Sequence, residues 1–406
     1  MKLLIWGDSP LASTGFGNIN KLLLNQLKKL DPNLDITVLG INSQGNWYDF
    51  EKYPYKIYPT YWNGNGILDT KDIIGYTRLL AVLSGVDNQI KENFDTLLVN
   101  LDVYMFDNLI NGQPFINLLK QICPHAIKKI IYCPLDADYL PKSWIENLKF
   151  FDTVVVPSNW ARKVIKMYDR ELFEKTTVIY HGFDTNEISS LPLEQKEQLK
   201  KGLGAEGKFV IGYVARNNWR KDIFRTIKIF SQFHSKYPDS FLYLHMKEKD
   251  EANIMTSFDI ASIAQKEGLY KFRDWATPED FDPGVGIPRD QMKYIYNALD
   301  IHLSTSMAEG FGMPLIESML SGTLTLSPNN TTIPELMNFD KNNFEIEKQL
   351  KVGRGIVYET NQEICLMNAG GARTYKLADE NSALTLLNQI YIINKNDIFK
   401  NMKIRA

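Results

Sequence analysis

The chain has few cysteines and no long hydrophobic run, and both absences narrow its class. Its 406 residues include three cysteines, none of them in a Cys-x-x-Cys pair. An odd, scattered count argues against a disulfide framework or a structural zinc site and favours a reducing compartment. No window approaches the roughly 18 apolar residues of a membrane span, and the first apolar run is too short for a signal peptide. We therefore expect a soluble, cytoplasmic protein without an integral membrane segment.

An excess of charge of one sign is also absent. Lys and Arg number 46 against 48 Asp and Glu, which gives a formal net charge of −2. No global basic field therefore attracts nucleic acid or an anionic membrane, although a local basic groove stays compatible with this balance. Hydrophobic residues make up 44% of the chain, so a disordered or collagen-like protein is excluded. At roughly 100–200 residues per domain, the length predicts two domains.

Short apolar runs alternate with helix-period segments along the chain. The runs at residues 3–6 and 209–215 are almost continuous and β-rich, which is typical of strands covered by helices on both faces. Between such runs, apolar residues recur at helical spacing, as at about 222–237. The alternation predicts an α/β fold with parallel sheets. Because the pattern restarts after residue 185, we expect two Rossmann-like domains that face a cleft.

The predicted boundaries follow from that restart. Residues 1–185 form the N-terminal Rossmann-like domain, and residues 186–375 form the C-terminal one. Residues 376–406 form a C-terminal helical tail, for which packing back on the N-terminal domain is one placement.

The most specific segment reads Glu-Gly-Phe-Gly-Met-Pro-Leu-Ile-Glu over residues 309–317. It follows a predicted strand and enters a predicted helix that opens at Pro314. Its glycines allow the backbone to approach a ligand, and the N–H groups of the first helical turn point outward as an anion or hydroxyl site. Glu309 and Glu317 can accept hydrogen bonds from hydroxyl groups at two places along a ligand. The alternative is that Glu309 caps the helix and Glu317 is solvated.

This segment resembles the Glu-x7-Glu signature of retaining GT-B glycosyltransferases of family 4. Residues 177–185 are similar to the family's interdomain strand and turn, and residues 211–221 to its strand with Arg and, five residues later, Lys. Residues 333–336 are similar to a following turn. The opening Gly-Asp-Ser-Pro is similar to divergent members from phages and large DNA viruses, for which the location would be the host cytoplasm.

The resemblance implies roles for individual residues. Arg216 and Lys221 would stabilise the charge that grows on the leaving diphosphate. Glu309 would contact the transferred sugar, and Glu317 the ribose of the donor. The other donor-binding candidates lie in the glycine loop after the first strand, in the first helical turn of the signature and at the end of a strand that approaches the nucleobase: Gly15, Gly17, Phe311, Gly312, Met313, His245 and Lys247.

The N-terminal domain would hold the acceptor, and the C-terminal domain the donor. Family members carry a catalytic His near residues 133–136, but this chain has none there. Asp136 is therefore the candidate to orient an acceptor hydroxyl, against a helix cap or Asx-turn. Asp136 and Asp138 have the spacing of a metal motif from the other main transferase fold without its usual context. We predict neither a metal nor a cofactor, and UDP or GDP as the donor nucleotide.

The sequence thus predicts a metal-independent, retaining hexosyl- or pentosyltransferase. It would move a sugar from a nucleoside-diphosphate sugar to an acceptor hydroxyl by front-side attack. The acceptor could be a glycan or a hydroxymethylated DNA base, although the net charge does not favour DNA. A nucleotide-sugar epimerase of the same fold and a non-catalytic nucleotide-sugar-binding module stay open as alternatives.

Overall fold

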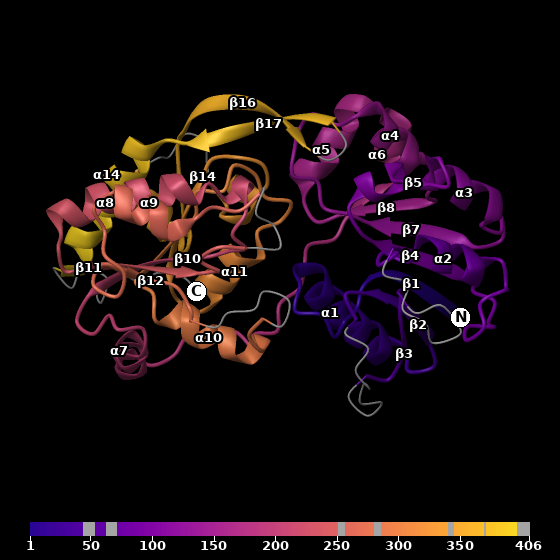
Figure 1. The fold of residues 1–406 in the computed structure, drawn as a ribbon, viewed down its shortest axis with the longest axis horizontal. Coiled ribbons are helices and arrows are strands. Elements are labelled where there is room, and N and C mark those ends of the chain that lie inside the picture. Colours follow the sequence, from indigo (N-terminus) through magenta and orange to yellow (C-terminus); the bar gives the residue numbers. More distant parts are fainter. Residues whose placement is uncertain are drawn as a thin grey trace. The chain divides into compact units, whose positions relative to one another are not determined.

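The computed structural model describes residues 1–43, 53–61, 71–250, 256–279, 286–339, 345–368 and 371–395. The chain divides into two compact units (Figure 1). Unit 1 comprises Met1–Gly182 and Met367–Arg373, and unit 2 comprises Phe183–Leu366 and Thr374–Ala406. No helix in these described stretches is both long and apolar enough to span a bilayer.

Unit 1 is built on a parallel sheet with the strand order β3-β2-β1-β4-β7-β8-β9. Strand β1 lies inside the sheet between β2 and β4, where Leu3 pairs with both Ile36 and Thr96, and it is buried along almost its whole length. The strands are β1 (Lys2–Asp8), β2 (Asp35–Ile41), β3 (Lys56–Pro59), β4 (Thr96–Asn100), β7 (Lys128–Tyr132), β8 (Thr153–Val156) and β9 (Thr176–Val178). Every neighbouring pair in this sheet runs parallel.

The connections of unit 1 are mainly helical. They are α1 (Gly15–Leu30), α2 (Tyr76–Leu83), η1 (Val103–Asp107), α3 (Phe115–Ile122), α4 (Lys142–Lys149), α5 (Asn159–Tyr168) and α6 (Arg170–Glu174). A small antiparallel pair, β5 (Leu109–Ile110) and β6 (Gln113–Pro114), interrupts them. Trp6 is fully buried in the core, where it meets the rings of Tyr76, Phe106 and Phe115. The apolar run at the start of the chain is therefore the centre of the core of unit 1.

Unit 2 repeats this plan with the order β12-β11-β10-β13-β14-β15. In chain order this is 3-2-1-4-5-6, the doubly wound arrangement in which ligands bind where the strand order reverses. The strands are β10 (Phe209–Val214), β11 (Ser240–His245), β12 (Trp275–Ala276), β13 (Ile301–Leu303), β14 (Leu324–Pro328) and β15 (Gly355–Tyr358). The reversal falls between β10 and β13, which pair in parallel with Ile211 opposite Ile301. The predicted α/β class with two Rossmann-like domains is confirmed.

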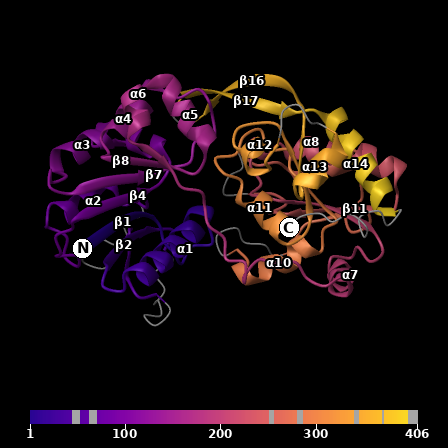
Figure 2. The same cartoon turned by 180° about the vertical axis from the view of Figure 1, so that it is seen from behind.

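Helices cover both faces of the sheet of unit 2 (Figures 1 and 2). Helices α8, α9 and α14 lie on one side and α7 and α10 on the other, and each side has its own apolar cluster. The helical segments are α7 (Leu193–Gly202), η2 (Trp219–Lys221), α8 (Ile223–Lys236), α9 (Ile260–Lys266), α10 (Arg289–Asn297), α11 (Met313–Leu320), α12 (Ile333–Leu336), α13 (Ile346–Val352) and α14 (Glu380–Lys395).

The C-terminal helix α14 packs within unit 2. The ring of Tyr391 stacks on that of Tyr237 with centroids 4.0 Å apart, and its hydroxyl donates to Asp239 over 2.6 Å. Packing back on the N-terminal domain was one expectation for this tail; the described part packs instead beside α8, and residues 396–406 lie outside the described residues. A hairpin of β16 (Thr360–Asn368) and β17 (Gly371–Ala378) precedes the helix, and the sequence did not predict it.

Candidate functional site

The signature segment connects β13 to α11 at the carboxyl edge of the sheet of unit 2. Helix α11 begins at Met313, next to the predicted opening at Pro314, and Gly312 caps it with φ at +90°. That conformation favours glycine, and a Cβ at Gly312 would also come within 3.0 Å of the Leu315 side chain. Phe311 is buried beside this turn. Pro314 has no N–H, and the Leu315 N–H donates to the Gly312 carbonyl over 3.0 Å, so of the first three residues of α11 Met313 is the one whose N–H can serve a ligand.

Glu309 is buried and held by two cations. Lys221 donates a hydrogen bond to Oε1, and Nη1 of Arg220 lies 3.6 Å from Oε2. Burial by itself would raise the pKa of Glu309, but the charges of Lys221 and Arg220 hold that pKa below its ordinary value. Glu309 is therefore ionised and does not cap α11.

Strand pairing explains how residues so distant in sequence meet. Strands β10 and β13 are parallel neighbours, so the segments that follow them leave the same edge of the sheet. The backbone N–H of Met307 donates to the carbonyl of Arg220 over 2.9 Å. The Thr305 hydroxyl donates to the carbonyl of Lys221 over 3.0 Å. These bonds fix η2 against the signature segment.

Arg216 occupies a different setting from Lys221. Its side chain is 60% exposed and lies 3.7 Å from Asp250, which is buried. Among the ion pairs of the described residues, the second cation at Glu309 is Arg220 rather than Arg216. Sequence reasoning missed Arg220, although its position directly before Lys221 was a signal for it.

Glu317 lies inside α11 and is also buried. Nη1 of Arg289 is 2.8 Å from its Oε1, and the Tyr296 hydroxyl donates to its Oε2 over 2.6 Å. Burial first, and then the charge of Glu317, raise the pKa of Tyr296 well above its ordinary value, so the hydroxyl keeps its proton. Glu317 is thus not a solvated helix residue. The sequence analysis missed Arg289 and Tyr296, although a cation in the first turn of a helix is unusual enough to be a signal.

The predicted nucleobase contacts lie at and beyond the end of β11. His245 is the last residue of that strand and is buried, and burial lowers its pKa to about 4, so the ring is neutral. The Tyr243 hydroxyl lies 3.4 Å from His245 Nδ1. Lys247 is half-buried, and its carbonyl accepts a hydrogen bond from Asn217 over 3.1 Å.

The glycine loop of unit 1 forms the start of α1. Thr14 caps this helix and accepts a hydrogen bond from the N–H of Gly17 over 3.0 Å. A Cβ at Gly17 would lie 2.4 Å from the Ala12 carbonyl oxygen, whereas one at Gly15 would meet nothing within 4 Å. Packing within the turn therefore requires Gly17, and the space beside Gly15 is open.

Asp8 lies directly before this loop, at the end of β1, and the sequence analysis did not select it. It accepts hydrogen bonds from the Thr14 hydroxyl and, over 3.2 Å, from Asn42 Nδ2. Burial raises the pKa of Asp8, and these two bonds only partly oppose the shift. Unit 1 thus carries a buried carboxylate at the end of its central strand.

Asp136 has an ionic partner in unit 1. Nη1 of Arg373 lies 3.2 Å from its Oδ1, and the same guanidinium sits 4.3 Å above the ring of Trp144. Arg373 belongs to β17, in the short piece of that hairpin that is grouped with unit 1. Three or more His, Cys, Asp or Glu side chains that could share a metal ion are not found together in the described stretches.

Similarity to known proteins is confined to structure. No family model and no curated protein matches the sequence. The crystal structure of HepE from Anabaena in complex with UDP matches with a TM-score of 0.61 and 14% identity, over 97% of this chain and 91% of that one. The chain has the GT-B fold. Sucrose-phosphate synthase from Thermosynechococcus elongatus matches it with a TM-score of 0.66 and 12% identity, over 96% and 89% of the two chains.

A glycosyltransferase from Rickettsia africae is a third similar GT-B structure, with a TM-score of 0.62 and 15% identity, and the match covers 97% of this chain and 88% of that one. At such identities the likeness shows the fold alone. The roles of individual residues must therefore come from the geometry of this chain.

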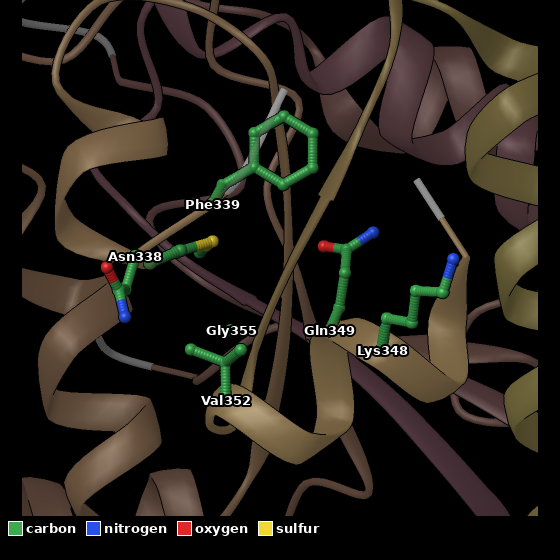
Figure 3. A pocket seen from close by; sticks show the side chains of 7 residues that line it. Asn338, Phe339, Lys348, Gln349, Val352 and Gly355 are labelled. Atoms are coloured by element: carbon green, nitrogen blue, oxygen red, sulfur yellow. The ribbon is translucent and has the colours of Figure 1, made fainter. Parts of the chain in front are cut away.

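One cavity of this GT-B chain lies apart from the signature (Figure 3). It has a volume of about 40 Å³, enough for a few water molecules but far too small for a nucleotide. Its lining comes from the segment after α12, from α13 and from the start of β15: Met337, Asn338, Phe339, Lys348, Gln349, Val352 and Gly355. This cavity is therefore not a candidate for the donor site.

Proposed function

We propose that the chain is a glycosyltransferase that takes a nucleoside-diphosphate sugar as donor. One observation carries the proposal: a buried carboxylate with two cations, Glu309 with Lys221 and Arg220, lies just before the amino terminus of α11. Two cations beside the amino terminus of a helix suit a diphosphate, and a carboxylate between them suits sugar hydroxyls.

The donor nucleotide is proposed to be UDP. Similar structures were solved with UDP and with UDP-glucose, as for HepE. Glu317 would accept hydrogen bonds from the ribose hydroxyls. Each of its carboxylate oxygens already has one partner and keeps a further lone pair. The nucleobase is proposed to bind at the end of β11, where His245 is the last residue of the strand and Lys247 follows it.

The proposed reaction is metal-independent and keeps the anomeric configuration. The bond between the anomeric carbon and the diphosphate oxygen breaks while the acceptor oxygen bonds to the same face of that carbon. The acceptor proton passes to the leaving phosphate, and Lys221 with Arg216 or Arg220 stabilises the charge on the diphosphate. The retained configuration rests on the resemblance of residues 309–317 to the family 4 signature.

The acceptor is proposed to bind on unit 1. Asp136 stays the candidate to orient the acceptor hydroxyl, and it lies 3.2 Å from Nη1 of Arg373. A glycan is the preferred acceptor, and a hydroxymethylated DNA base is the second, because the net charge of −2 does not favour a DNA duplex.

The first experiment is a thermal-shift panel with UDP-, GDP-, ADP- and dTDP-sugars, each with and without EDTA. A ligand at 100 times its Kd adds about 2.7 kcal/mol of stability, so a selective shift that EDTA does not change is expected with one nucleotide. Nuclear magnetic resonance of the product then reports its anomeric configuration. Conversion of the donor without any acceptor would identify an epimerase instead, and binding without turnover for any acceptor would identify a binding module. A donor shift that vanishes with EDTA would overturn metal independence.

A further inference from the structure

Arg289 is the first residue of α10, and it is buried although it is charged. Its side chain is only 8% exposed. The helix dipole disfavours a cation at this end of a helix, and burial of a charge is costly unless partners compensate it. A buried arginine at this position therefore needs a reason.

Part of that reason is Glu317. Arg289 and Tyr296 are seven residues apart on α10, which places them on one face of the helix, two turns from each other. From that face, Arg289 contacts one carboxylate oxygen of Glu317, and Tyr296 donates to the other. A carboxylate offers about four lone-pair positions, so each oxygen of Glu317 keeps room for one more donor.

Arg289 also keeps donors of its own. Within the described residues, neither its Nε nor its Nη2 has a hydrogen-bond acceptor, although both atoms are buried. The Nε lies 3.3 Å from Glu187 Oε2 without the alignment of a hydrogen bond. Native proteins rarely leave buried donors unpaired, since such donors have lost water without a replacement. Unpaired donors beside a carboxylate with spare acceptor positions match a ligand that bears hydroxyl groups.

The aromatic surroundings agree with a ligand site. The guanidinium of Arg289 lies 5.9 Å from the centre of the Phe183 ring. Phe183 in turn stacks on Phe311 of the signature, with centroids 6.3 Å apart. The free donors of Arg289 thus belong to the same neighbourhood as the first turn of α11.

We propose that Arg289 binds the ribose of the donor together with Glu317. The inference rests on the proposed function. A ribose hydroxyl both donates and accepts: Glu317 accepts from its O–H, and Arg289 donates to its oxygen. A 2′-deoxyribose cannot complete this pair. The site therefore selects ribonucleoside diphosphates over their 2′-deoxy counterparts, and Arg289 adds to the selectivity that Glu317 provides.

The test compares two proteins, the wild type and a variant at Arg289, with two ligands, UDP and 2′-deoxy-UDP. Calorimetry gives the Kd of each of the four pairs. The wild-type protein is expected to bind UDP about tenfold or more tightly than 2′-deoxy-UDP, because a hydrogen bond to a charged group is lost. In R289M, which keeps an apolar stem but no donors, the ratio should fall by about threefold or more, because only the bond from the hydroxyl to Glu317 remains. An R289M variant with the wild-type ratio would overturn the inference.

A matched control is K200M, which removes another buried cation of unit 2, the partner of Asp300 at 2.9 Å. It should lower the melting temperature and leave the ratio of the two Kd values unchanged. If K200M also lowered that ratio, the loss of any buried cation of unit 2 would have the same effect, and the effect of R289M would not be specific to Arg289. If R289M does not fold, R289K serves, because it keeps a charge near Glu317 but lacks the second planar donor. The ratio should fall in R289K as well. Wild-type protein that binds no nucleotide would refute the proposed function itself, whereas binding without preference for UDP would refute only the role of Arg289.

Discussion

The two units share a strand order but treat a buried carboxylate at the edge of the sheet in opposite ways. In unit 1, Asp8 is the last residue of β1, and it accepts hydrogen bonds from the neutral side chains of Thr14 and Asn42. In unit 2, Glu309 follows β13, and its partners are the cations Lys221 and Arg220. Burial is the largest influence on both pKa values, yet that of Asp8 is raised and that of Glu309 is lowered.

The difference teaches that the strand order decides where a carboxylate lies, and the neighbouring residues decide its charge. Neutral donors do not offset the lost hydration of Asp8, whereas two cations more than offset that of Glu309. Unit 2 therefore presents a charged cluster that suits an anionic donor, and unit 1 presents a carboxyl group that gains a proton more readily.

The largest effect is expected from Lys221→Met, which removes one of the two cations that distinguish Glu309 of unit 2 from Asp8 of unit 1. Of its two cations Glu309 would keep Arg220, at 3.6 Å, and loss of one partner of a buried pair costs about 3–5 kcal/mol. Turnover should also fall more than donor affinity, because the diphosphate charge peaks after the ground state. Urea unfolding and donor turnover measure the two losses.

The control for this variant is Lys221→Met combined with Glu309→Gln. The double variant should regain part of the stability, since no buried charge is left unpaired, but no activity. A single variant that loses donor affinity alone, with its turnover intact, would contradict the role given to Lys221.

A smaller effect is expected in the glycine loop of unit 1. Gly17→Ala should destabilise the protein by about 1–3 kcal/mol, because the new methyl group would sit 2.4 Å from the Ala12 carbonyl oxygen. Gly15→Ala is the matched control and should change stability by less than about 1 kcal/mol, since its Cβ meets nothing within 4 Å. Calorimetric melting of both variants measures the contrast, and equal losses would show that the turn is not packed as described.

The pH dependence should separate the two carboxylates by sign. The lowered pKa of Glu309 gives stability that is present above its unfolded pKa and is lost as pH falls through the folded pKa. The raised pKa of Asp8 gives stability that is present below its unfolded pKa and is lost as pH rises through the folded pKa. The wild-type protein should therefore lose its advantage over Glu309→Gln on acidification, and over Asp8→Asn as pH rises.

Each of these changes is limited to about 1.4 kcal/mol per pH unit for one proton. Denaturant unfolding of the wild type and the two variants between pH 3 and pH 7 provides the differences. If the stability differences of the two variants from the wild type changed with pH in the same direction, the contrast between Asp8 and Glu309 would be wrong.

The smallest effect on stability is expected from Arg216→Ala. The side chain is 60% exposed, so its pair with Asp250 is screened by solvent and contributes about 0–1 kcal/mol. If Arg216 reaches the diphosphate as proposed, turnover should nevertheless fall, and Arg220→Ala is the comparison variant. Unchanged turnover in Arg216→Ala with a loss in Arg220→Ala would transfer the role from Arg216 to Arg220.

Much of the fold could be predicted because strands and helix ends have local causes. The run at residues 209–215 became β10 (Phe209–Val214), and the helix expected at about 222–237 became α8 (Ile223–Lys236). The cap of α5 is equally local, since the Ser158 hydroxyl accepts a hydrogen bond from the N–H of Ala161 over 3.1 Å. The hairpin of β16 and β17 was missed, since its mixed sequence shows no clear alternation of apolar and polar residues.

The sequence by itself determined the two α/β units, the glycine turn before α11 and the presence of two glutamates on either side of that turn. These features depend on periodicity and on backbone conformation, which neighbouring residues set. Only the tertiary structure decided which cations meet those glutamates. Lys221 is 88 residues from Glu309, and Arg289 comes from a different helix than Glu317. Such partners are chosen by strand order and helix packing, which bring distant segments to one edge of a sheet.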